Sequence, residues 1–573
     1  MPRYTFRTTY DKPGVFNLTD ILLEGRGITG KDNQDAFLNP DYDQHTYSPS
    51  LMKDMDKAVR RVTNAVRNNE KICIYSDFDC DGIPGAVVLS DFFKKISYSN
   101  FEHYIPHRHR EGFGVHKAAI EKICDGGTKL IITIDCGIVD NQSVARAVEL
   151  GADVIVTDHH MPGDELPPAF AILNPKQPGC EYPEKMLCGA AVIWKLVKGL
   201  VDSGNFEVSK GWEKWLLDMV GIATLSDMVP LTGENRVLAR YGLTVLRKSP
   251  RPGLVQLFSS LKVKQRLLVE EDITFLVSPR INAASRMADP EDALVLLATK
   301  SETEADEAVR HLNKINDERK ALVAVMVKEI KKKVEERDLG NPQSHPVIVL
   351  GNPDWKPPLL GLVATSLIRE YRKPMFLWGR SDEGVIKGSC RSEGVTDVVL
   401  LMRSMPEQVF INRGGHAMSG GFSVASDHIH SFEAEILKSY AATFKALEAA
   451  EGDTASGGSL IADADISIDD VSWSLWDTIE RLSPFGEANP KPVFILRDVT
   501  LGQVKMFGKK KEHAELMLLG SRRPIPAIRF FAEDIQDKLE SLKEGQKITL
   551  AVNIEKSNFK NYPELRMRLV ELL

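Results

Sequence analysis

The sequence contains no long apolar run. No window approaches the roughly 18 consecutive apolar residues that a membrane-spanning helix requires. The first residues, MPRYTFRTTYDKPG, also lack the apolar segment of a secretory signal. These features predict a soluble cytoplasmic protein without a membrane partner.

The sequence has few cysteines, and their pattern excludes two kinds of structure. The seven cysteines are odd in number, scattered, and never spaced as C-x-x-C. Such a pattern indicates neither a disulfide framework nor a structural zinc knuckle. A reducing compartment fits it.

The chain also has fewer basic than acidic residues. The chain has 73 Lys and Arg residues against 80 Asp and Glu residues, a formal net charge of -7. This net negative charge disfavours extensive, non-specific binding of nucleic acid. It says little about the charge of a local groove, and an acidic metal site would itself add to the negative charge. The length of 573 residues is typical of a globular protein with roughly three or four domains.

The first third of the chain alternates between β-rich and amphipathic helical segments. The helical patterns lie near 84–96, 115–124 and 140–150, and they separate the β-rich runs KICIYS (71–76), FEHYI (101–105), KLIITI (129–134) and DVIVT (153–157). Repeated βαβ units predict a parallel sheet with helices on its faces.

The remainder divides into further segments. Helical patterns dominate 186–246 and 291–337, a second α/β pattern runs from HPVIVLG to a helix near 427–450, and short alternating strands after EGDTASGGS predict a small β-barrel. The predicted domains are an N-terminal arm (1–48), an α/β domain (49–305), a connecting helix (306–340), a second α/β domain (341–450), a linker (451–459) and the barrel (460–573).

Acidic residues follow the strands of the first predicted sheet. Asp77, Asp79 and Asp81 follow the first strand, Asp135 follows the third, and the triplet Asp158-His159-His160 follows the fourth. Ligands bind at the carboxyl edge of an open parallel sheet, so we expect the three clusters to converge on one crevice. If the segment after the first strand stays extended, alternation places its three acids on one face.

These clusters predict a metal site. A single Asp before a Gly is more often a turn former or a helix cap. Acids at three strand ends, however, would leave several buried charges unpaired, and a divalent cation is the usual remedy. Oxygen and imidazole donors without thiolate favour Mn²⁺ or Mg²⁺, with Fe²⁺ or Zn²⁺ still open.

Eight motifs carry a resemblance to a known family. SDFDCDG, IDCG, TDHH and IATLSDMVPL, in this order, resemble the four motifs of the DHH phosphoesterase superfamily. PRINAASRM, KGSCRS, GGHAMSGG and LSPFGEANPKPVF resemble one branch of it, the RecJ exonucleases, which degrade single-stranded DNA from 5′ to 3′. The resemblance covers nearly the whole chain. It implies an α/β fold with a DHH lobe, a connecting helix, a DHH-associated lobe and an oligonucleotide-binding (OB) barrel.

The resemblance also implies roles for individual residues. The implied metal ligands, which would hold two divalent cations, Mn²⁺ or Mg²⁺, are Asp79, Asp81, Asp135 (bridging both ions), His159 and Asp227. The residues implied to orient or polarise the site are Asp77, Asp158 and His160. Those implied to contact the nucleotide and its phosphates are Arg108, Arg280, Asn282, Arg286, Ser389, Arg391, Gly414, Gly415 and His416. Arginine suits this task because its planar fork matches a phosphate.

By this resemblance the protein hydrolyses single-stranded DNA to 5′-mononucleotides in repair and recombination, by attack of a metal-activated water. Implied partners are single-strand-binding protein and a RecQ-like helicase, and the implied state is a monomer. Two alternatives stay open. One is a DHH phosphodiesterase acting on short RNA, cyclic dinucleotides or nucleoside bisphosphates, and the other is a non-catalytic replication scaffold.

Two stretches of the sequence have an unusual composition. Where RecJ-like sequences commonly read W-H-x-G-V-I-G, this one reads WKPPLLG from Trp355, which removes a His. The loop HYIPHRHREGFGVH is rich in histidine, and we expect its histidines on a solvated, DNA-facing surface rather than in a second metal site.

The predicted barrel mixes cationic and aromatic residues. Those expected to bind strands are Lys505, Lys509, Lys510 and Phe559. Stacking and backbone attraction bind single strands without reading sequence. The alternative is a solvated barrel surface with core aromatics.

Overall fold

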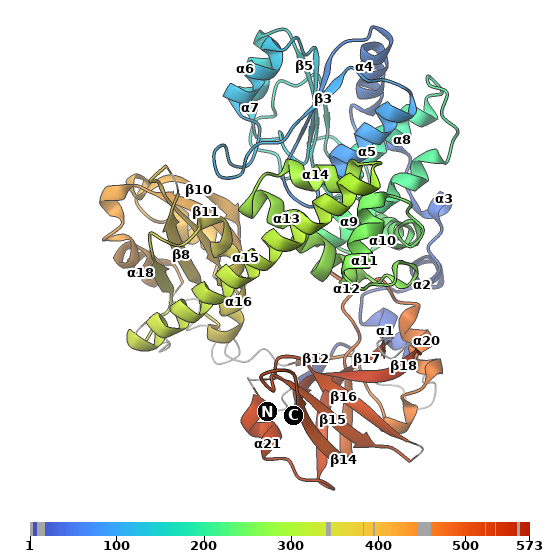
Figure 1. Ribbon diagram of the computed structural model, residues 1–573, viewed down its shortest axis with the longest axis vertical. Helices are drawn as coiled ribbons and strands as arrows, with labels where there is room; N and C mark the ends of the chain where they lie inside the picture. The colour runs from blue at the N-terminus through green and yellow to red at the C-terminus, as the bar shows by residue number, and fades with distance from the viewer. Residues whose placement is uncertain are drawn as a thin grey trace.

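The computed structural model describes residues 4–8, 18–339, 345–381, 383–393, 396–444, 460–521, 523–532, 535–557 and 562–573. Two α/β lobes and a barrel are arranged as Figure 1 shows, with one long helix running from the first lobe to the second. Among the described residues, no helix is both long and apolar enough to cross a membrane.

The first lobe contains the predicted parallel sheet. Its strand order is β3-β2-β4-β5-β6, all parallel, with β2 at Ile72–Ser76, β3 at Phe101–Tyr104, β4 at Leu130–Ile134, β5 at Asp153–Thr157 and β6 at Ala171–Leu173. Side chains alternate between the faces: Ile72 and Ile74 join the core under α5 (Gly82–Lys95), whereas Cys73 and Tyr75 pack with α6 (Lys117–Asp125) and α7 (Asn141–Glu149). The prediction of a parallel sheet with covered faces is confirmed, and β6 was not predicted.

Helices complete this lobe beyond the sheet. They are α4 (Met55–Arg67), α8 (Gly189–Asp202), α9 (Leu217–Ser226), α10 (Gly233–Leu246), α11 (Pro252–Ser260), α12 (Glu270–Asp272), α13 (Ser278–Met287) and α14 (Glu291–Ala298). Helices α8 and α9 pack against α5, so residues at their ends reach the carboxyl edge of the sheet.

The connecting helix α15 spans Glu302–Glu336 and is capped by the Ser301 hydroxyl. Ala308 and Leu312 belong to the core of the first lobe, while Ile330 and Val334 belong to the core beneath the second. Because one continuous helix contributes to both cores, it fixes the spacing of the lobes.

The second lobe has a mixed sheet of order β10-β11-β9-β8-β7, in which only β7 and β8 are parallel neighbours. Its strands are β7 (Ile348–Gly351), β8 (Met375–Arg380), β9 (Ile386–Arg391), β10 (Phe410–His416) and β11 (Ser419–Val424), and its helices are α16 (Pro357–Tyr371), α17 (Val398–Arg403) and α18 (Phe432–Thr443). The two prolines of WKPPLLG are the first residues of α16, where the missing amide hydrogens are not needed. The predicted linker 451–459 lies outside the described residues.

The C-terminal strands form the predicted barrel. The sheet runs β13-β14-β15-β16-β18-β17 and closes through pairing of β14 with β17. The elements are β12 (Leu460–Ala462), β13 (Ala464–Asp465), α20 (Trp473–Glu480), β14 (Phe494–Phe507), β15 (His513–Leu519), β16 (Pro524–Arg529), α21 (Gln536–Glu540), β17 (Lys547–Ser557) and β18 (Glu564–Leu572).

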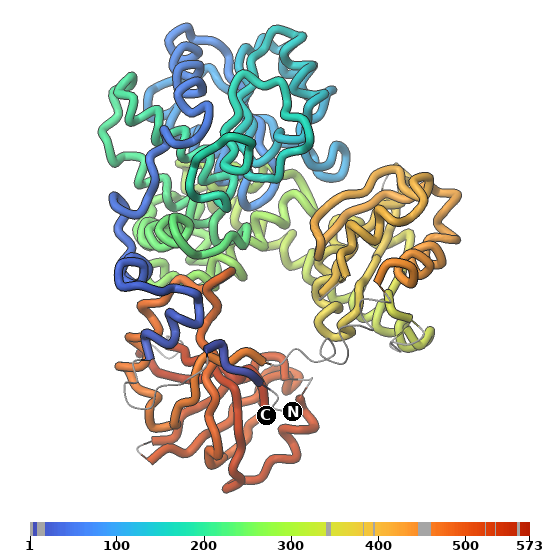
Figure 2. Tube along the Cα trace, turned by 180° about the vertical axis from the view of Figure 1, so that it is seen from behind, coloured from blue at the N-terminus to red at the C-terminus, as the bar shows by residue number. Residues whose placement is uncertain are grey.

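The N-terminal residues attach to this barrel, which the sequence pattern did not indicate. Strand β1 (Tyr4–Phe6) pairs in parallel with β12, and Leu22 and Leu23 of α1 (Leu18–Glu24) are buried in the barrel core. Figure 2 shows the chain then rising from the barrel to the first lobe through α2 (Lys31–Leu38) and α3 (Tyr42–His45). The two ends of the chain thus share one structural unit.

One buried arginine joins the barrel to the first lobe. The Arg236 guanidinium of α10 donates hydrogen bonds to the carbonyl oxygens of Phe37, Arg481, Leu482 and Ser483. The Phe37 carbonyl belongs to the N-terminal arm, and the other three belong to the LSPFGEANP motif and to Arg481, the residue before it. The motif therefore packs against the first lobe.

Candidate metal centre and phosphate-binding residues

The first acidic motif is a turn, not the extended segment that alternation assumed. Asp81 has a helical backbone conformation at the start of α5, and the Asp79 carboxylate accepts hydrogen bonds from the amides of Asp81 and Gly82. The turn still directs Asp77 and Asp79 into one cavity, while the Cys80 thiol points to the Ser226 hydroxyl 3.3 Å away. The expected convergence of the acids at the carboxyl edge of the sheet is confirmed, whereas the prediction of an extended segment is wrong.

Asp81 is held by the beginning of α8, a contact that sequence reasoning missed. Its carboxylate oxygens accept hydrogen bonds from the amides of Gly189 (2.5 Å) and Ala190 (2.7 Å), at the beginning of α8. A helix N-terminus stabilises negative charge, so α8 fixes the carboxylate in place. A Cβ at Gly189 would lie 2.6 Å from the Cβ of Asp135, so this helix can approach only with glycine there.

Asp135 lies at the centre of the acidic cluster. It is buried, with a left-handed backbone (φ 62°) that non-glycine residues rarely adopt. Its Oδ1 atom and that of Asp77 have no hydrogen-bond partner. Strained backbone and unpaired buried oxygens are costly, and they concentrate at functional sites.

The two histidines of TDHH differ in charge. His159 Nε2 lies 3.2 Å from Asp135 Oδ1, 3.7 Å from Asp227 Oδ2 and 3.8 Å from Asp81 Oδ2. Burial and the neighbouring charge of His160 lower the pKa of His159 to about 3, so its imidazole is neutral and can donate a lone pair. Burial acts against a charged His160, but its hydrogen bond to Asp158 and nearby negative charge raise its pKa to about 9.

Asp158 positions this pair rather than joining the donors. Its Oδ1 atom accepts hydrogen bonds from the amides of His159 and His160 and lies 2.8 Å from His160 Nδ1, while its Oδ2 atom accepts from the Ile138 amide. Both oxygens are therefore occupied. The sequence-based role of orienting His160 agrees with this geometry.

The donor atoms fit divalent cations. Three groups have ligand atoms within 4.8 Å of one another: Asp77, Asp79 and Asp135; Asp81, His159 and Asp227; and Asp135, His159 and His160. In the absence of a cation, burial and mutual repulsion raise the pKa of Asp81 to about 7 and that of Asp227 to about 8, and raise that of Asp135 well above its usual value. Carboxylates and a neutral imidazole without thiolate suit Mn²⁺ or Mg²⁺. The unpaired oxygens and the repulsion are what such cations would relieve.

The cavity above these donors has a volume of about 240 Å³. Arg108, Arg286 and Asn282 line it together with the acidic residues. Phe113, which sequence reasoning did not assign, also lines it, is half-exposed (49%) and contacts His160 edge-on at 5.4 Å between ring centroids. Its place in the loop REGFG offered no local signal beyond an aromatic between glycines.

Arginines from both lobes lie near this cavity. The Arg108 guanidinium lies over the Phe78 ring, 4.8 Å from its centroid. Burial, followed by the charges of Arg108, Arg319 and Arg391, lowers the pKa of Arg286 to about 9. Arg391 reaches this group past Gly361, where a Cβ would lie 2.7 Å from the guanidinium. Guanidinium groups from both lobes therefore lie close together, next to the acidic residues of the metal cavity.

Two residues of PRINAASRM make contacts that the prediction did not include. Arg280 donates hydrogen bonds to Asn313 on α15 and to the Leu276 carbonyl, and it lines neither the metal cavity nor the adjoining space between the lobes. The Arg280 guanidinium thus braces α13 against α15, and its contact with the nucleotide stays a prediction. Asn282 accepts a hydrogen bond from the Cys80 amide, so it also supports the acidic turn.

The remaining second-lobe residues lie in neighbouring positions on strands β9 and β10, which both pair with β11. His416 pairs with Ser419, which pairs with Arg391, and Gly414 pairs with Gly421, which pairs with Ser389. Gly415, between Gly414 and His416 in β10, has φ 137°, and a Cβ there would clash with Ser419. The register thus brings the KGSCRS and GGH motifs together. The side chain of His416 is exposed.

The histidine-rich loop forms no second metal site among the described residues. His103 lies 2.9 Å from the Ser90 hydroxyl, and burial lowers its pKa to about 4. The expectation of a solvated surface is therefore wrong for His103. His107 and His109 line the space between the lobes.

On the barrel, Lys505, Lys509 and Lys510 are exposed, whereas Phe559 lies outside the described residues. An aromatic cluster surrounds His513: its ring lies 5.1 Å from Phe507, 5.3 Å from Phe530 and 5.1 Å from Phe531. Phe530, expected to be a core residue under the solvated-barrel alternative, is 37% exposed, and Phe531 is 68% exposed.

Comparison with known proteins agrees with this geometry. The DHH family N-terminal domain matches residues 71–224, and the RecJ OB domain matches residues 462–571. The single-stranded-DNA-specific exonuclease RecJ of Bacillus subtilis is 32% identical over 560 residues, which cover 96% of this chain and 67% of that protein. The chain belongs to the RecJ family.

Other RecJ proteins extend the comparison. The RecJ of Salmonella typhimurium is 30% identical over 81% of each chain. A crystal structure of RecJ with Mn²⁺ from Thermus thermophilus matches with a TM-score of 0.77 at 24% identity, covering 97% of this chain and 76% of that one. Another RecJ exonuclease bound to manganese matches with a TM-score of 0.60 at 28% identity, covering 70% and 97%. The RecJ fold is therefore shared by both lobes and the barrel.

Proposed function

We propose that this protein is a metal-dependent exonuclease that degrades single-stranded DNA from 5′ to 3′ and releases 5′-mononucleotides. One observation carries the proposal: Asp77, Asp79 and Asp135 line the same cavity as Arg108 and Arg286. A phosphodiester needs cations on both sides, and here carboxylates can hold metal cations on one wall while arginines supply the other. The RecJ relatives are named single-stranded-DNA-specific exonucleases.

We assign the metal ligands as Asp79, Asp81, Asp135, His159 and Asp227, with Asp77 beside them. Two bound Mn²⁺ or Mg²⁺ ions would activate water and neutralise charge on the phosphate. Asp81 is kept in place by the amides of α8, and His159 remains neutral at physiological pH because of its burial. These features preorganise the donors before a cation binds.

His160 is the protein's proton-bearing group at this centre. With a pKa raised to about 9, it carries a positive charge near neutral pH, and Asp158 fixes the direction of its ring. We assign it to stabilise the negative charge that develops on the phosphoryl oxygens. Phe113 lies against His160 with half its surface exposed, and it suits stacking on the terminal base.

The barrel supports a strand as substrate. Phe530 and Phe531 are exposed around His513, and the Arg566 and Arg568 guanidiniums each lie 5.8 Å from the Phe530 ring centroid. Exposed rings and cations bind single strands by stacking and charge, without reading sequence. A phosphodiesterase for short RNA, cyclic dinucleotides or nucleoside bisphosphates has no need of such a surface.

The setting of this activity is also a proposal. DNA repair and recombination fit a nuclease of single strands, for which a RecQ-like helicase would produce the substrate and a single-strand-binding protein would cover it. We propose a cytoplasmic monomer. Sedimentation of the purified chain with and without single-strand-binding protein tests the oligomeric state and that partner together.

The deciding experiment for the activity is a time course on single-stranded DNA and RNA labelled at either end, in Mn²⁺, Mg²⁺ or EDTA. We expect the 5′ label to be released first as a mononucleotide, only with a divalent cation. Release of the 3′ label first would refute the polarity. Hydrolysis limited to the shortest oligonucleotides would favour the short-substrate phosphodiesterase, and a lack of turnover would favour the scaffold.

A further inference from the structure

A second cavity adjoins the metal cavity and lies between the two α/β lobes. Its volume is about 780 Å³. Residues 107–110 and 286–288 line it from the first lobe, and residues 353–358, Arg380, Ser381, Glu383 and Lys387 line it from the second. We call this space the lobe cleft. Arg108 and Arg286 line both the lobe cleft and the metal cavity, so the two spaces meet at these guanidiniums.

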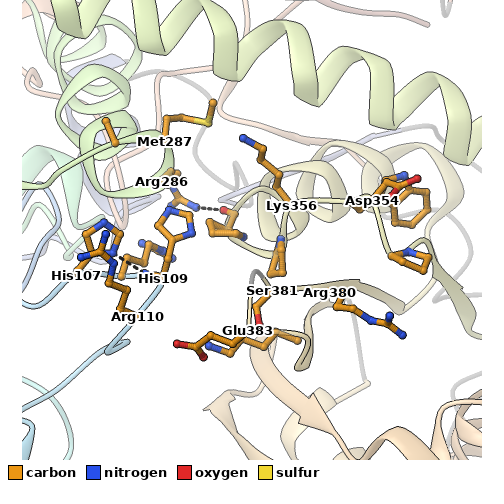
Figure 3. Close-up of a pocket in the computed structure, with 17 residues that line it drawn as sticks. His107, His109, Arg110, Arg286, Met287, Asp354, Lys356, Arg380, Ser381 and Glu383 are labelled. Atoms are coloured by element: carbon orange, nitrogen blue, oxygen red, sulfur yellow. Dashed lines mark hydrogen bonds between the residues drawn. The ribbon is translucent and has the colours of Figure 1, made fainter.

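The lobe cleft is strongly cationic. Among its described lining residues, Asp354 and Glu383 are acidic, while six are Arg or Lys: Arg108, Arg110, Arg286, Lys356, Arg380 and Lys387. Figure 3 shows the Lys356 ammonium pointing toward the Arg286 side of the cleft, whereas the Arg380 side chain extends away from it. Cations that share a partly enclosed space repel one another, and an anionic ligand relieves that repulsion.

Near the place where the two spaces meet, the described hydrogen bonds of Arg286 and Arg391 include none to a carboxylate. Arg286 donates to the Pro358 carbonyl, and Arg391 donates to the Cys390 carbonyl. Their charges are therefore available to an anion. Lys356 is exposed and precedes α16 at a position where RecJ-like sequences commonly have a histidine, so this chain has a permanent positive charge there.

The size and charge of the lobe cleft exceed what a 5′-monophosphate needs. If the scissile phosphate lies on the metal centre, the 5′-phosphate of the terminal nucleotide lies on the far side of that nucleotide, where Arg108 and Arg286 separate the two spaces. A monophosphate bound there would leave Lys356 and the rest of the cleft unused. Further phosphates attached to it would extend toward Lys356.

We propose that the lobe cleft accepts the β- and γ-phosphates of a 5′-triphosphate end, so that the enzyme degrades single strands with a 5′-triphosphate directly. This inference rests on the proposed 5′ to 3′ exonuclease function. In the first turnover, the oxygen of water bonds to the phosphorus between nucleotides one and two, and the bond from that phosphorus to O3′ of nucleotide one breaks. O3′ takes up a proton. The products are a nucleoside 5′-triphosphate and a shortened strand with a 5′-monophosphate.

The test compares a 5′-triphosphate with a 5′-monophosphate on the same short single strand, in deoxyribose and ribose forms, because either nucleic acid can carry a triphosphate. We expect wild-type kcat/KM on the triphosphate end to lie within about threefold of that on the monophosphate end, since added charge is matched by added cations. The first product, identified by mass, should be the nucleoside triphosphate. Activity on either triphosphate strand supports the proposal and identifies the nucleic acid concerned.

Lys356→Ala is the diagnostic variant, because this exposed side chain can be removed without disturbing a core. We expect it to lower kcat/KM on the triphosphate end about tenfold, the effect of losing one charge-assisted contact, and to change the monophosphate end less than about twofold. Arg380→Ala is the matched control, because Arg380 lines the same cleft but points away from Arg286. It should leave both rates near wild type.

Three results would overturn the inference while leaving the exonuclease intact. They are resistance of the triphosphate strand when the monophosphate strand is degraded, release of phosphate or pyrophosphate before any nucleotide, and an equal loss on both ends in Lys356→Ala. If the monophosphate strand also survives in Mn²⁺, the proposed exonuclease function itself fails, and this inference fails with it.

Discussion

The two walls of the proposed phosphate site are built in different ways. The acidic wall comes from one continuous sheet, whose strands β2, β4 and β5 end in Asp77, Asp135 and Asp158. The cationic wall is assembled from separate places: Arg108 in a loop, Arg286 on α13 and Arg391 on β9 of the other lobe. Metal ligands need distances fixed to a fraction of an ångström, and a sheet edge supplies them. Phosphate recognition across two lobes depends instead on how α15 spaces them.

The largest effect is expected on the acidic wall. Asp135→Asn should lower kcat at least about a thousandfold, because losing a ligand of both cations removes several kcal/mol of charge stabilisation. Asparagine is chosen because it tolerates the left-handed backbone of Asp135 better than alanine does. Steady-state hydrolysis of a short single strand in Mn²⁺ provides the measurement.

The same variant should be more stable than wild type in EDTA, since one buried charge in a repelling cluster is gone. Thermal unfolding in EDTA provides this control for folding. A variant that is folded and keeps more than about a tenth of the wild-type rate would contradict the role of Asp135 as a shared ligand.

A smaller but clear effect is expected on the cationic wall. Arg391→Lys should lower kcat/KM about tenfold to a hundredfold although it preserves charge, because an ammonium cannot reproduce a planar fork against phosphate oxygens. Arg403→Lys, at an exposed end of α17, is the matched control and should be unchanged. If both variants match wild type, Arg391 has no place in the phosphate site.

The barrel should affect long strands more than short ones. Phe531→Ala removes an exposed ring beside His513, and we expect affinity for a long single strand to fall about tenfold, while hydrolysis of very short strands changes little. Leu519→Ser, at the opposite end of β15, tests whether any exposed apolar residue has this effect. Equal losses in the two variants would count against stacking. Deleting the whole barrel is less informative, because Leu22 and Leu23 of the N-terminal arm would lose their core.

The smallest expected effect is a pH dependence of stability in the metal-free protein. The pKa values of Asp81 and Asp227 are raised to about 7 and about 8 in the folded chain, against roughly 4 when unfolded. Between these values the folded chain binds more protons, so the free energy of unfolding falls as pH rises from about 4 to about 8. Cations bind the deprotonated ligands, so Mn²⁺ should raise Tm more at pH 8 than at pH 5.

Scanning calorimetry in EDTA and in Mn²⁺ across this range measures both slopes. Asp227→Asn should flatten the decline in EDTA, since it removes one of the titrating groups. If the variant keeps the wild-type slope, Asp227 does not contribute to the decline.

Local sequence patterns predicted the acidic wall but not its supports. Strand ends place Asp135 and His159, because the end of a β-rich run can be read from the local sequence. The amides of α8 that hold Asp81, and Gly189 that lets α8 approach Asp135, lie more than a hundred and more than fifty positions away from those residues, respectively. The local periodicity of a sequence does not encode contacts between residues so far apart in the chain.

The cationic wall shows the same limit. Arg280 and Arg286 lie in one motif, but the turn of α13 directs the first to Asn313 and the second to the cavity. The attachment of β1 to β12 joins residues more than 450 positions apart. Each of these strands has only three residues, which is too short for a recognisable sequence pattern. The family resemblance could name such residues, whereas only the assembled fold assigns their contacts.

The most direct test of a two-walled phosphate site is a crystal structure with Mn²⁺ and a phosphorothioate single strand that resists hydrolysis, using anomalous scattering to locate manganese. Our account predicts two manganese positions that share Asp135, one at Asp79 beside Asp77 and the other among Asp81, His159 and Asp227. The 5′-phosphate of the strand should lie against Arg108, Arg286 and Arg391. Manganese bound elsewhere, or a 5′ end that points away from these arginines, would contradict it.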